Sequence, residues 1–480
     1  MVRMKYDVII VGAGVIGALT ARELTGYNLS VCLLEKENDV ACGASKANSG
    51  IIHGGFDPEP NTEKARLNVA GVPLLYEAAK QLHVPFKQNG SMVCAFSAEE
   101  EAHLQLLYDR GITNGVTDME ILTGDQARVL EPHLSPAVTA VLRIPTAGII
   151  CPYFLTIAAV GNAMDNGAHL KTNFEVTAIT KDKDGFTVQS AAGDTVHGTY
   201  FINCAGCYAD KIAALVDDAF YRIIPRAGEY MLLDKIEGAR VSHTIFQVPT
   251  AAGKGILVSP TADGNLLVGP TASAVPDPTH TETTPTGLQT VATLAKKSVP
   301  SVQLGSVITS FSGVRSSEKG GDFIIKASEK ANGFIHVAAI DSPGLSSSVA
   351  IAKEVVKLLE KAGLALVPNP QFNGERKDTH AFRRMSAAEK NAYIKEHPAY
   401  GKIVCRCETV SEGEIRDAIR MNPRATDVDG VKRRTRAGMG RCQGGFCMPY
   451  VLRLLAEENG VTMTAVTKKG KDSRPLTGKL

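Results

Sequence analysis

The chain has 480 residues, more than one ordinary hydrophobic core can hold, so two or three domains are expected. Hydrophobic residues make up 44% of the sequence and charged residues 21%, the proportions of a globular protein. The net charge of +2 gives no general attraction to nucleic acid or to anionic membranes. The first residues predict a folded strand rather than a signal peptide, and no apolar stretch is long enough to be a transmembrane segment. We therefore expect a cytoplasmic location, with any attachment to a membrane going through partner proteins.

In chain order, residues 6–35 predict a strand, a glycine-rich turn, a helix and a second strand, which together form a parallel pair with a helical crossover. Residues 63–82 and 97–110 are predicted helices. Alternating apolar residues and the turn sequences KDGF and AGDT predict a β-meander over residues 174–206. A strand, a turn and a helix follow in residues 333–363.

The turn between the first strand and the first helix has the G-x-G-x-x-G spacing of a dinucleotide site, with Gly12, Gly14 and Gly17. The first glycine permits the tight turn, the second lets a pyrophosphate approach the backbone, and the third lets the helix pack closely on the strand. Unpaired N–H groups and the dipole at the start of the helix favour the phosphates. Glu35 ends the second strand, where its carboxylate can accept a hydrogen bond from a ribose 2′-OH. The motif alone does not distinguish FAD from NAD.

Two later segments resemble the FAD-contacting loops of the D-amino-acid-oxidase-like flavoproteins: INCAGCYAD (residues 202–210) and AAIDSPGLSSSVAIA (residues 338–352). The segments GEYMLLDK, KGILVSPTADGNLLVGPT and FSGVRSSEKGGDFII resemble the substrate domain of a narrower group. That group is the FAD-dependent glycerol-3-phosphate dehydrogenases and oxidases, with L-2-hydroxyglutarate dehydrogenase as a near relative, and the chain looks most like the anaerobic type of these dehydrogenases. The resemblance covers about residues 5–370 and implies FAD as the cofactor, with no nicotinamide.

The fold class that follows is α/β: a Rossmann-like FAD-binding domain interleaved with a mixed β-sheet substrate domain, plus a small C-terminal α-helical iron–sulfur module. The flavoprotein is expected over residues 1–375. Its FAD-binding parts are about 1–75, 145–215 and 331–375, and its substrate-domain parts about 76–144 and 216–330. Residues 376–400 are polar with scattered prolines, as expected of a linker. The iron–sulfur module is expected over residues 401–458, and a polar, lysine-rich tail over 459–480.

The resemblance also implies which residues contact FAD, and they come from the glycine turn, the segments after the second strand, and the later flavin loops. The expected contacts are Gly12, Gly14, Val15, Ile16, Gly17, Glu35, Lys36, Ser45, Asn48, Ser49, Val176, Ala205, Gly206, Gly313, Pro343, Gly344, Leu345 and Ser346.

The stretch GASKANSGIIHGG, residues 43–55, offers hydroxyls, amides and backbone N–H groups that suit a pyrophosphate or the polar edge of a flavin. Oxidation of a secondary alcohol needs a base for the hydroxyl proton, and histidine is the usual choice. On its residues alone, the stretch favours a histidine whose ring is satisfied by loop carbonyls. In the glycerol-3-phosphate enzymes the matching segment also ends in IHGG with its histidine over the flavin, so the resemblance implies that His53 is catalytic.

Arg315 is the second candidate for the reaction, because a guanidinium fork binds a phosphate or a carboxylate through two hydrogen bonds. The resemblance implies that it binds and orients an anionic alcohol as part of the catalytic site. The alternative is a surface arginine paired with Glu318 or Asp322. Lys254 and Tyr230 are weaker candidates for lining the same substrate pocket.

Four cysteines are confined to a short C-terminal region: Cys405, Cys407, Cys442 and Cys447, in a C-x-C-x34-C-x4-C pattern. Four thiolates can hold a 2Fe–2S cluster or a tetrahedral zinc, and the unequal spacings suit two irons better than the C-x2-C knuckles of zinc sites. The module resembles the bacterioferritin-associated-ferredoxin-like domain, which implies a 2Fe–2S cluster on these cysteines. The basic run KRRTR, residues 432–436, either offsets the thiolate charge or forms a solvated face or a docking patch.

The combination predicts an enzyme, a flavin-dependent dehydrogenase that oxidises sn-glycerol 3-phosphate to dihydroxyacetone phosphate. An oxidase that reduces O2 directly would not need the cluster, so electrons are expected to leave through it to an electron-acceptor subunit or a second flavoprotein. A close alternative is a dehydrogenase of L-2-hydroxyglutarate or another 2-hydroxy acid, since an arginine binds carboxylate as well. Another alternative is a non-catalytic electron-transfer subunit of a flavoprotein complex.

Overall fold

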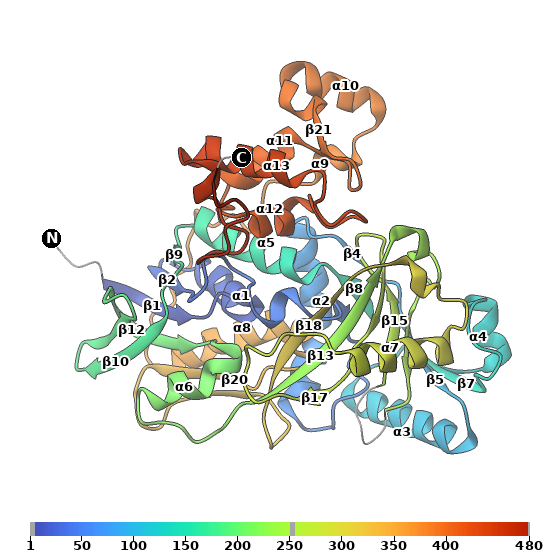
Figure 1. Ribbon diagram of the computed structural model, residues 1–480. Helices are drawn as coiled ribbons and strands as arrows, with labels where there is room; N and C mark the ends of the chain where they lie inside the picture. Colours follow the sequence, from blue (N-terminus) through green and yellow to red (C-terminus); the bar gives the residue numbers. More distant parts are fainter. Residues whose placement is uncertain (1–4, 250–254, 479–480) are drawn as a thin grey trace.

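The computed structural model describes residues 5–249 and 255–478 (Figure 1). Two large β-sheets share the chain up to residue 338, and a small helical module formed by the C-terminal residues lies beside helix α5 (Pro152–Asp165). None of the helices within the described ranges combines the length and the apolar character that a membrane span requires.

The first sheet, here called the β1 sheet, has the strand order β10-β11-β12-β1-β2-β9, with β20 also paired to β12 and β19 paired to β20. Strand β12 is parallel to both β1 and β20, and β2 is parallel to both β1 and β9, whereas β10–β12 form the antiparallel meander that the turn sequences predicted. The strands are β1 Lys5–Val11, β2 Val31–Leu34, β9 His169–Lys171, β10 Val176–Asp182, β11 Gly185–Ser190, β12 Thr195–Asn203, β19 Ile324–Ala327 and β20 Phe334–Ala338.

Strand β1 is apolar on both faces because both faces are covered, as is usual for parallel sheets. Val8 and Ile10 belong to one hydrophobic cluster with the helices α1 (Val15–Leu24), α2 (Glu63–Gln81), α5 and α8 (Gly344–Lys361). Ile9 and Val11 point the other way and belong to a second cluster that contains the phenylalanines of β11, β12 and β20. Helices α1 and α8 follow β1 and β20, which are both parallel to β12, so both helices begin at the carboxyl ends of the parallel strands. The predicted helix over residues 63–82 is confirmed by α2.

The second sheet, here called the β13 sheet, has the order β17-β13-β16-β15-β14-β5-β7-β6, with β18 also paired to β13. Helix α3 (Ala98–Asn114), predicted over residues 97–110, packs on one face, and α7 (Pro285–Ser298) packs on the other. The strands are β5 Ser91–Ala95, β6 Glu120–Thr123, β7 Ala140–Ile144, β13 Ile224–Leu233, β14 Thr244–Gln247, β15 Leu257–Pro260, β16 Leu266–Gly269, β17 Ser273–Ala274 and β18 Val307–Ser317.

A small three-stranded sheet, β3-β8-β4, joins the two large ones. Its strands are β3 Ile51–Ile52, β4 Phe86–Lys87 and β8 Gly148–Ile150. The remaining α-helices among the described residues of this part are α4 (Gly124–Leu130) and α6 (Ala209–Ala214). Because β3 leads directly into His53, the pairing of β3 with β8 fixes the position of that histidine between the large sheets.

The C-terminal module has its own hydrophobic core, which includes Val410, Ile415, Val431 and Leu454. It consists of a two-stranded sheet and three helices: β21 Ile403–Cys405, β22 Val410–Ser411, α11 Glu412–Arg420, α12 Val428–Thr435 and α13 Met448–Asn459. The predicted tail also packs against the module, since Val466 belongs to this core.

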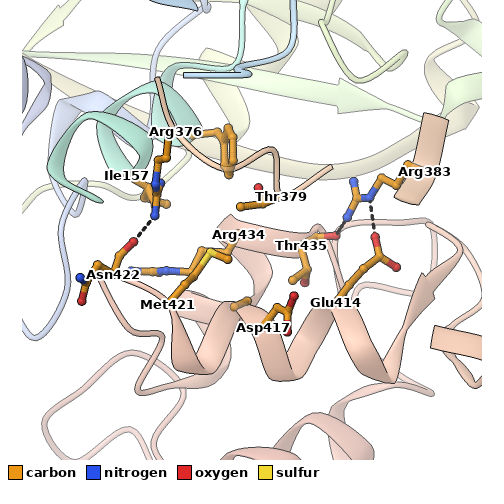
Figure 2. Close-up of a pocket in the computed structure, with 12 residues that line it drawn as sticks. Ile157, Arg376, Thr379, Arg383, Glu414, Asp417, Met421, Asn422, Arg434 and Thr435 are labelled. Atoms are coloured by element: carbon orange, nitrogen blue, oxygen red, sulfur yellow. Dashed lines mark hydrogen bonds and ion pairs between the residues drawn. The ribbon is translucent and has the colours of Figure 1, made fainter. Parts of the chain in front are cut away.

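The segment predicted as a linker contains two helices, α9 (Ala381–Arg384) and α10 (Ala387–Glu396). Its arginines attach the module to the rest of the chain: Arg376 donates to the carbonyl of Asn422, and Arg383 donates both to the carbonyl of Thr435 and, at 2.9 Å, to Glu414. Figure 2 shows these side chains around a cavity of about 20 Å³, which has room for roughly one water molecule and none for a substrate.

Candidate functional site

A cavity of about 2170 Å³ connects the edge of the β1 sheet with the β13 sheet. Its walls include the glycine turn, the segment 42–51, His53, and one face of the β13–β18 pair. This volume exceeds the roughly 300–1,000 Å³ of ordinary ligand pockets, so it has room for an extended dinucleotide together with a small substrate.

The glycine turn has the shape that a dinucleotide diphosphate needs. Gly12 has a φ of +102°, and a Cβ there would overlap the carbonyl oxygen of Cys204. A Cβ on Gly17 would overlap the carbonyl oxygen of Gly12, so glycine at this position lets α1 lie against the turn. The Oγ of Ser45 accepts a hydrogen bond of 2.8 Å from the N–H of Val15 in the first turn of α1. The segment 44–46 is thereby held across the start of the helix, which is the anion-favouring end.

Glu35 is buried at the end of β2 and lines the cavity. Its two carboxylate oxygens accept hydrogen bonds from the N–H groups of Ala13 (2.9 Å) and Glu37 (3.0 Å). Burial raises the pKa of Glu35, and the two N–H groups act in the opposite direction by stabilising the carboxylate. Each oxygen keeps a free lone pair, so the side chain can still accept from a ribose hydroxyl.

His53 is held through its backbone on both sides. Its N–H donates to the Oγ of Ser346 at 2.7 Å, and its carbonyl accepts from the side-chain amide of Asn68 at 2.8 Å. The ring lines the cavity, half-buried, with its Nε2 3.4 Å from the Oγ of Ser342 and its centroid 5.8 Å from that of Phe246. Ser342 and Ser346 flank the start of α8, so this helix and the histidine are positioned together. The ring therefore faces the space in which a substrate would lie.

Helix α8 begins at the cavity without a capping side chain and without an acidic residue in its first turn. Pro343, Gly344 and Leu345 line the cavity at this end. The N–H of Gly344 donates to the carbonyl of Asp341, but the positive end of the helix dipole is still directed at the cavity and favours a negatively polarised group of a ligand.

Three cross-strand pairs follow one another on the cavity face of β13 and β18. The rings of Tyr230 and Phe311 stack at 4.9 Å, and the hydroxyl of Tyr230 lies 3.1 Å from the Oγ of Ser49. Next comes the pair of Gly228 and Gly313, and a Cβ on Gly313 would overlap the backbone of segment 44–49. Gly313 therefore lets this segment lie directly on the sheet, which brings the predicted flavin loop and the predicted substrate domain together, whereas a Cβ on Gly228 would overlap the guanidinium of Arg315.

The third pair is Arg226 opposite Arg315, and both side chains line the cavity. Arg315 donates two long bonds of 3.4 Å to the carbonyl of Thr271. Among the residues that the structure describes, neither arginine forms an ion pair. Like charges directly opposite each other on a ladder are unfavourable, which makes this pair suited to an anionic ligand.

The alternative of a surface arginine paired with a nearby carboxylate does not hold for Arg315. The carboxylate of Asp322 instead accepts from the N–H groups of Glu63 (2.9 Å) and Lys64 (3.0 Å) at the start of α2. Sequence reasoning missed Arg226, although the alternation of residues 226, 228 and 230 along one strand is the signal that places it on the same face as Tyr230.

Most of the expected FAD contacts line the cavity: Gly12, Gly14, Val15, Ile16, Glu35, Lys36, Ser45, Asn48, Ser49, Ala205, Gly206, Gly313, Pro343, Gly344 and Leu345. Gly17 and Ser346 act behind the wall, through helix packing and through the N–H of His53. Val176 packs against the aromatic cluster of the β1 sheet and is not among the lining residues. Lys254 lies outside the described residues.

The four C-terminal cysteines come from two loops that face each other. Cys405 and Cys447 are buried, Cys442 is half-buried and Cys407 is exposed, with the Sγ atoms of Cys407 and Cys442 3.6 Å apart. A Cβ on Gly440 would overlap the side chain of Cys407, so glycine lets the loops approach. The hydrogen bond with Cys447, together with the backbone N–H groups of Gly438 and Glu408, lowers the pKa of Cys405, which favours the thiolate that a metal needs.

A single zinc and a 2Fe–2S cluster require different arrangements of the four thiolates. Within residues 5–249 and 255–478, no group of three or more His, Cys, Asp or Glu side chains is placed to hold a single metal ion. A tetrahedral zinc would need its thiolates about 2.3 Å from one point, whereas a 2Fe–2S cluster takes two on each iron.

Comparison with known proteins matches both parts of the chain to protein families. Residues 7–358 match the family of FAD-dependent oxidoreductases, and residues 403–457 match the family of BFD-like [2Fe-2S]-binding domains. A glycerol 3-phosphate dehydrogenase of Caloramator mitchellensis is 46% identical over 98% of this chain and 98% of its own. The L-2-hydroxyglutarate dehydrogenase of Bos taurus is 31% identical over 56% of this chain and 61% of its own. Among solved structures, the L-alpha-glycerophosphate oxidase of Mycoplasma pneumoniae with FAD bound has a TM-score of 0.74 and 35% identity, over 78% of this chain and 98% of its own.

Proposed function

Because the chain belongs to the FAD-dependent oxidoreductases, in the family of the glycerol 3-phosphate dehydrogenases with a C-terminal [2Fe-2S]-binding domain, we propose that it oxidises sn-glycerol 3-phosphate to dihydroxyacetone phosphate. Its cofactors are FAD and a 2Fe–2S cluster. FAD, when bound, accepts the hydride of the alcohol carbon, and the cluster carries electrons singly. The observation that carries the proposal is the pair of arginines without carboxylate partners, among the described residues, in the cavity that His53 faces.

His53 is the proposed base. Its backbone is fixed at both the N–H and the carbonyl, and the hydroxyl of Ser342 lies within reach of Nε2. The Nε2 atom takes the proton of the substrate hydroxyl, while the hydride leaves from the carbon that bears this hydroxyl. Placing the base on a fixed backbone keeps the imidazole aligned with the alcohol, which general base catalysis requires.

Arg315 binds the phosphate of the substrate in this proposal, with Tyr230 beside it on the same face of β13 and β18. A guanidinium holds a phosphate through two parallel hydrogen bonds and thereby orients the rest of the molecule. Arg226 adds a second positive charge, which suits a doubly charged phosphate monoester better than a single carboxylate. Lys254 remains a predicted contact of the same pocket.

Electrons are proposed to leave through the cluster on Cys405, Cys407, Cys442 and Cys447 to a partner, either an electron-acceptor subunit or a second flavoprotein. The exposure of Cys407 supports this route, because it places one edge of the cluster site at the surface. The main competing function is the oxidation of a 2-hydroxy acid, because the L-2-hydroxyglutarate dehydrogenases are also relatives of this chain.

Anaerobic mixing of the purified chain with each alcohol tests the proposal, with the flavin absorbance as the readout. We expect glycerol 3-phosphate to bleach the flavin at far lower concentration than L-2-hydroxyglutarate. The reverse order would make the chain a 2-hydroxy-acid dehydrogenase. No bleaching by either alcohol would mean that the flavin is reduced by a partner.

A variant of the base separates catalysis from cofactor binding. His53→Ala should slow flavin reduction by about 10²–10⁴-fold, the usual contribution of a general base, while FAD stays bound. His103→Ala on α3 is the control and should reduce at the normal rate. Loss of FAD from His53→Ala would give this histidine a structural role instead.

A further inference from the structure

The cavity of the flavin site has a wall that the sequence did not predict. Besides the glycine turn and segment 42–46, its lining includes residues of α12 and of the C-terminal segment 467–473, here called the tail loop. Lys468, Lys469, Gly470, Lys471, Asp472 and Ser473 all line it. The lysine-rich tail therefore lies over an interior site.

The tail loop is a folded turn attached to the module. The carbonyls of Thr467 and Lys468 accept from the N–H groups of Val428 and Asp429 at the start of α12, at 3.1 and 2.9 Å. Within the loop, the N–H of Gly470 donates to the Oγ1 of Thr467 at 3.1 Å. The preceding Val466 is buried in the core of the module. These contacts give the loop a defined position relative to the cavity.

The loop meets the flavoprotein at the nucleotide end of the site. Gly470 is buried against Asn38, where a Cβ would overlap the asparagine side chain. Asn38 also donates to Asp427 at 2.6 Å, just before α12. Since Asn38 lies three residues after Glu35, the expected partner of the ribose, the tail loop borders the part of the cavity that would receive the adenylate and the diphosphate.

The charges of the loop are not balanced. Lys468 pairs with Asp429 at 3.2 Å, whereas Lys469 and Lys471 form no ion pair within the described part of the chain. Asp472 is the one carboxylate of the loop. Lys36, which lines the same cavity, is paired with Glu37 at 3.2 Å. The nucleotide end of the cavity thus carries an excess of positive charge that comes from the C-terminal module.

We propose that the tail loop is the outer wall of the FAD site and that Lys469 and Lys471 bind the diphosphate of the cofactor. Their two ammonium groups would add to the N–H groups at the start of α1, which favour the diphosphate. The iron–sulfur module then has a second role, because it retains FAD as well as carrying the cluster. This inference depends on FAD alone and not on the identity of the alcohol.

The double variant Lys469→Glu, Lys471→Glu tests the proposal, because it reverses both charges and leaves the backbone contacts of the tail loop in place. FAD is removed from the purified full-length chain and titrated back, with the quenching of flavin fluorescence as the readout. The matched control is Lys183→Glu, an exposed lysine in the turn between β10 and β11. ADP, which shares the diphosphate, is tested as a competitor of FAD.

We expect the double variant to raise the dissociation constants of FAD and of ADP by about tenfold or more at low salt, with a smaller effect at high salt, where exposed charges are screened. The control should bind both as the unaltered chain does. An FAD affinity within twofold of the unaltered chain, or the same loss in Lys183→Glu, would overturn the proposal. Because no alcohol is present, this result is independent of the substrate test.

Discussion

Two groups of arginines in this molecule have opposite surroundings. Arg433 and Arg434, on α12, are buried and both bind the carboxylate of Asp39, at distances of 2.6 and 2.8 Å. Arg315, on β18, lies in the large cavity, where the carbonyl of Thr271 is its hydrogen-bond partner among the described residues. The charge of the first group is neutralised by the protein, whereas the charge of Arg315 has no carboxylate partner among the described residues. Residues of one type thus hold two domains together in one place and are the proposed anion-binding residues in another.

The buried group joins the module to the loop after β2. Arg434 donates one hydrogen bond to each oxygen of Asp39 and further bonds to the carbonyls of Pro423 and Gly430. Arg436 makes a similar junction with the β13 sheet, through Asp263 and Asn265. The run KRRTR is therefore a structural contact between domains and not a solvated face.

Breaking the buried group should give the largest effect. Asp39→Ala leaves two buried guanidinium groups without their partner, and we expect the free energy of unfolding to fall by about 3–5 kcal/mol. Denaturant unfolding measures this loss, and limited proteolysis should release the C-terminal module. Glu329→Ala, which removes an exposed ion pair with Lys326, is the control and should cost less than about 1 kcal/mol. Equal effects of the two variants would contradict the assignment of Asp39.

The same contact predicts how stability depends on pH. Burial alone would raise the pKa of Asp39, but Arg434 and Arg433 lower it to about 2. Because the folded pKa lies below the ordinary value of about 3.9, the contribution is complete above that value and disappears as the pH falls from about 4 to 2. The contribution amounts to about 2–3 kcal/mol, since one pKa unit corresponds to about 1.4 kcal/mol. The difference in unfolding free energy between the unaltered chain and Asp39→Ala should therefore narrow by this amount in this range, and a constant difference would contradict the lowered pKa.

Much of the fold could be predicted because its signals are local. The glycine spacing around Gly12, the acid at Glu35 and the alternation in residues 174–206 each specify a turn, a strand end or a meander within a few residues. The resemblance supplied the cofactors and the order of the segments. The interleaving of two sheets follows from strands far apart in sequence, such as β5 pairing with β14, and local patterns do not show it.

The contacts between domains could not be predicted, because they join residues that are distant in sequence. Asp39 is one acidic residue among many until α12 is placed against it. For the same reason, the tail was predicted only as polar and lysine-rich, and its place over the cavity was missed. Arg226 was overlooked because it precedes the segment GEYMLLDK that carried the resemblance, and its cross-strand neighbour Arg315 lies far along the chain.

Removing the cavity arginine of β18 should affect substrate binding and not folding. Arg315→Ala is expected to raise the concentration of glycerol 3-phosphate needed for half-maximal flavin reduction by about 30-fold. This factor corresponds to the loss of one charged pair of hydrogen bonds, which contributes about 2 kcal/mol. The denaturation midpoint should stay unchanged. Arg315→Lys should restore part of the affinity, since it keeps the charge and loses the fork. An unchanged substrate dependence would remove Arg315 from the site.

The smallest effect is expected from Arg226, the second arginine of this face. Arg226→Ala should weaken glycerol 3-phosphate about tenfold, because the remaining guanidinium still holds the phosphate. It should weaken the binding of L-2-hydroxyglutarate less. The half-saturating concentration of L-2-hydroxyglutarate divided by that of glycerol 3-phosphate should therefore fall. An equal loss for both alcohols would mean that this residue contributes general attraction to anions and no preference for phosphate.

The destination of the electrons distinguishes a dehydrogenase that reduces its cluster from an oxidase whose cluster takes no part in the reaction. The chain is reduced anaerobically with glycerol 3-phosphate, and the 2Fe–2S cluster is followed by electron paramagnetic resonance. We expect the signal of the reduced cluster to appear on addition of the alcohol and to be absent from Cys442→Ser, in which the flavin still bleaches. A flavin that bleaches while the cluster of the unaltered chain stays oxidised, and that is reoxidised when O2 is then admitted, would contradict the proposal that the chain is a dehydrogenase that exports electrons through the cluster.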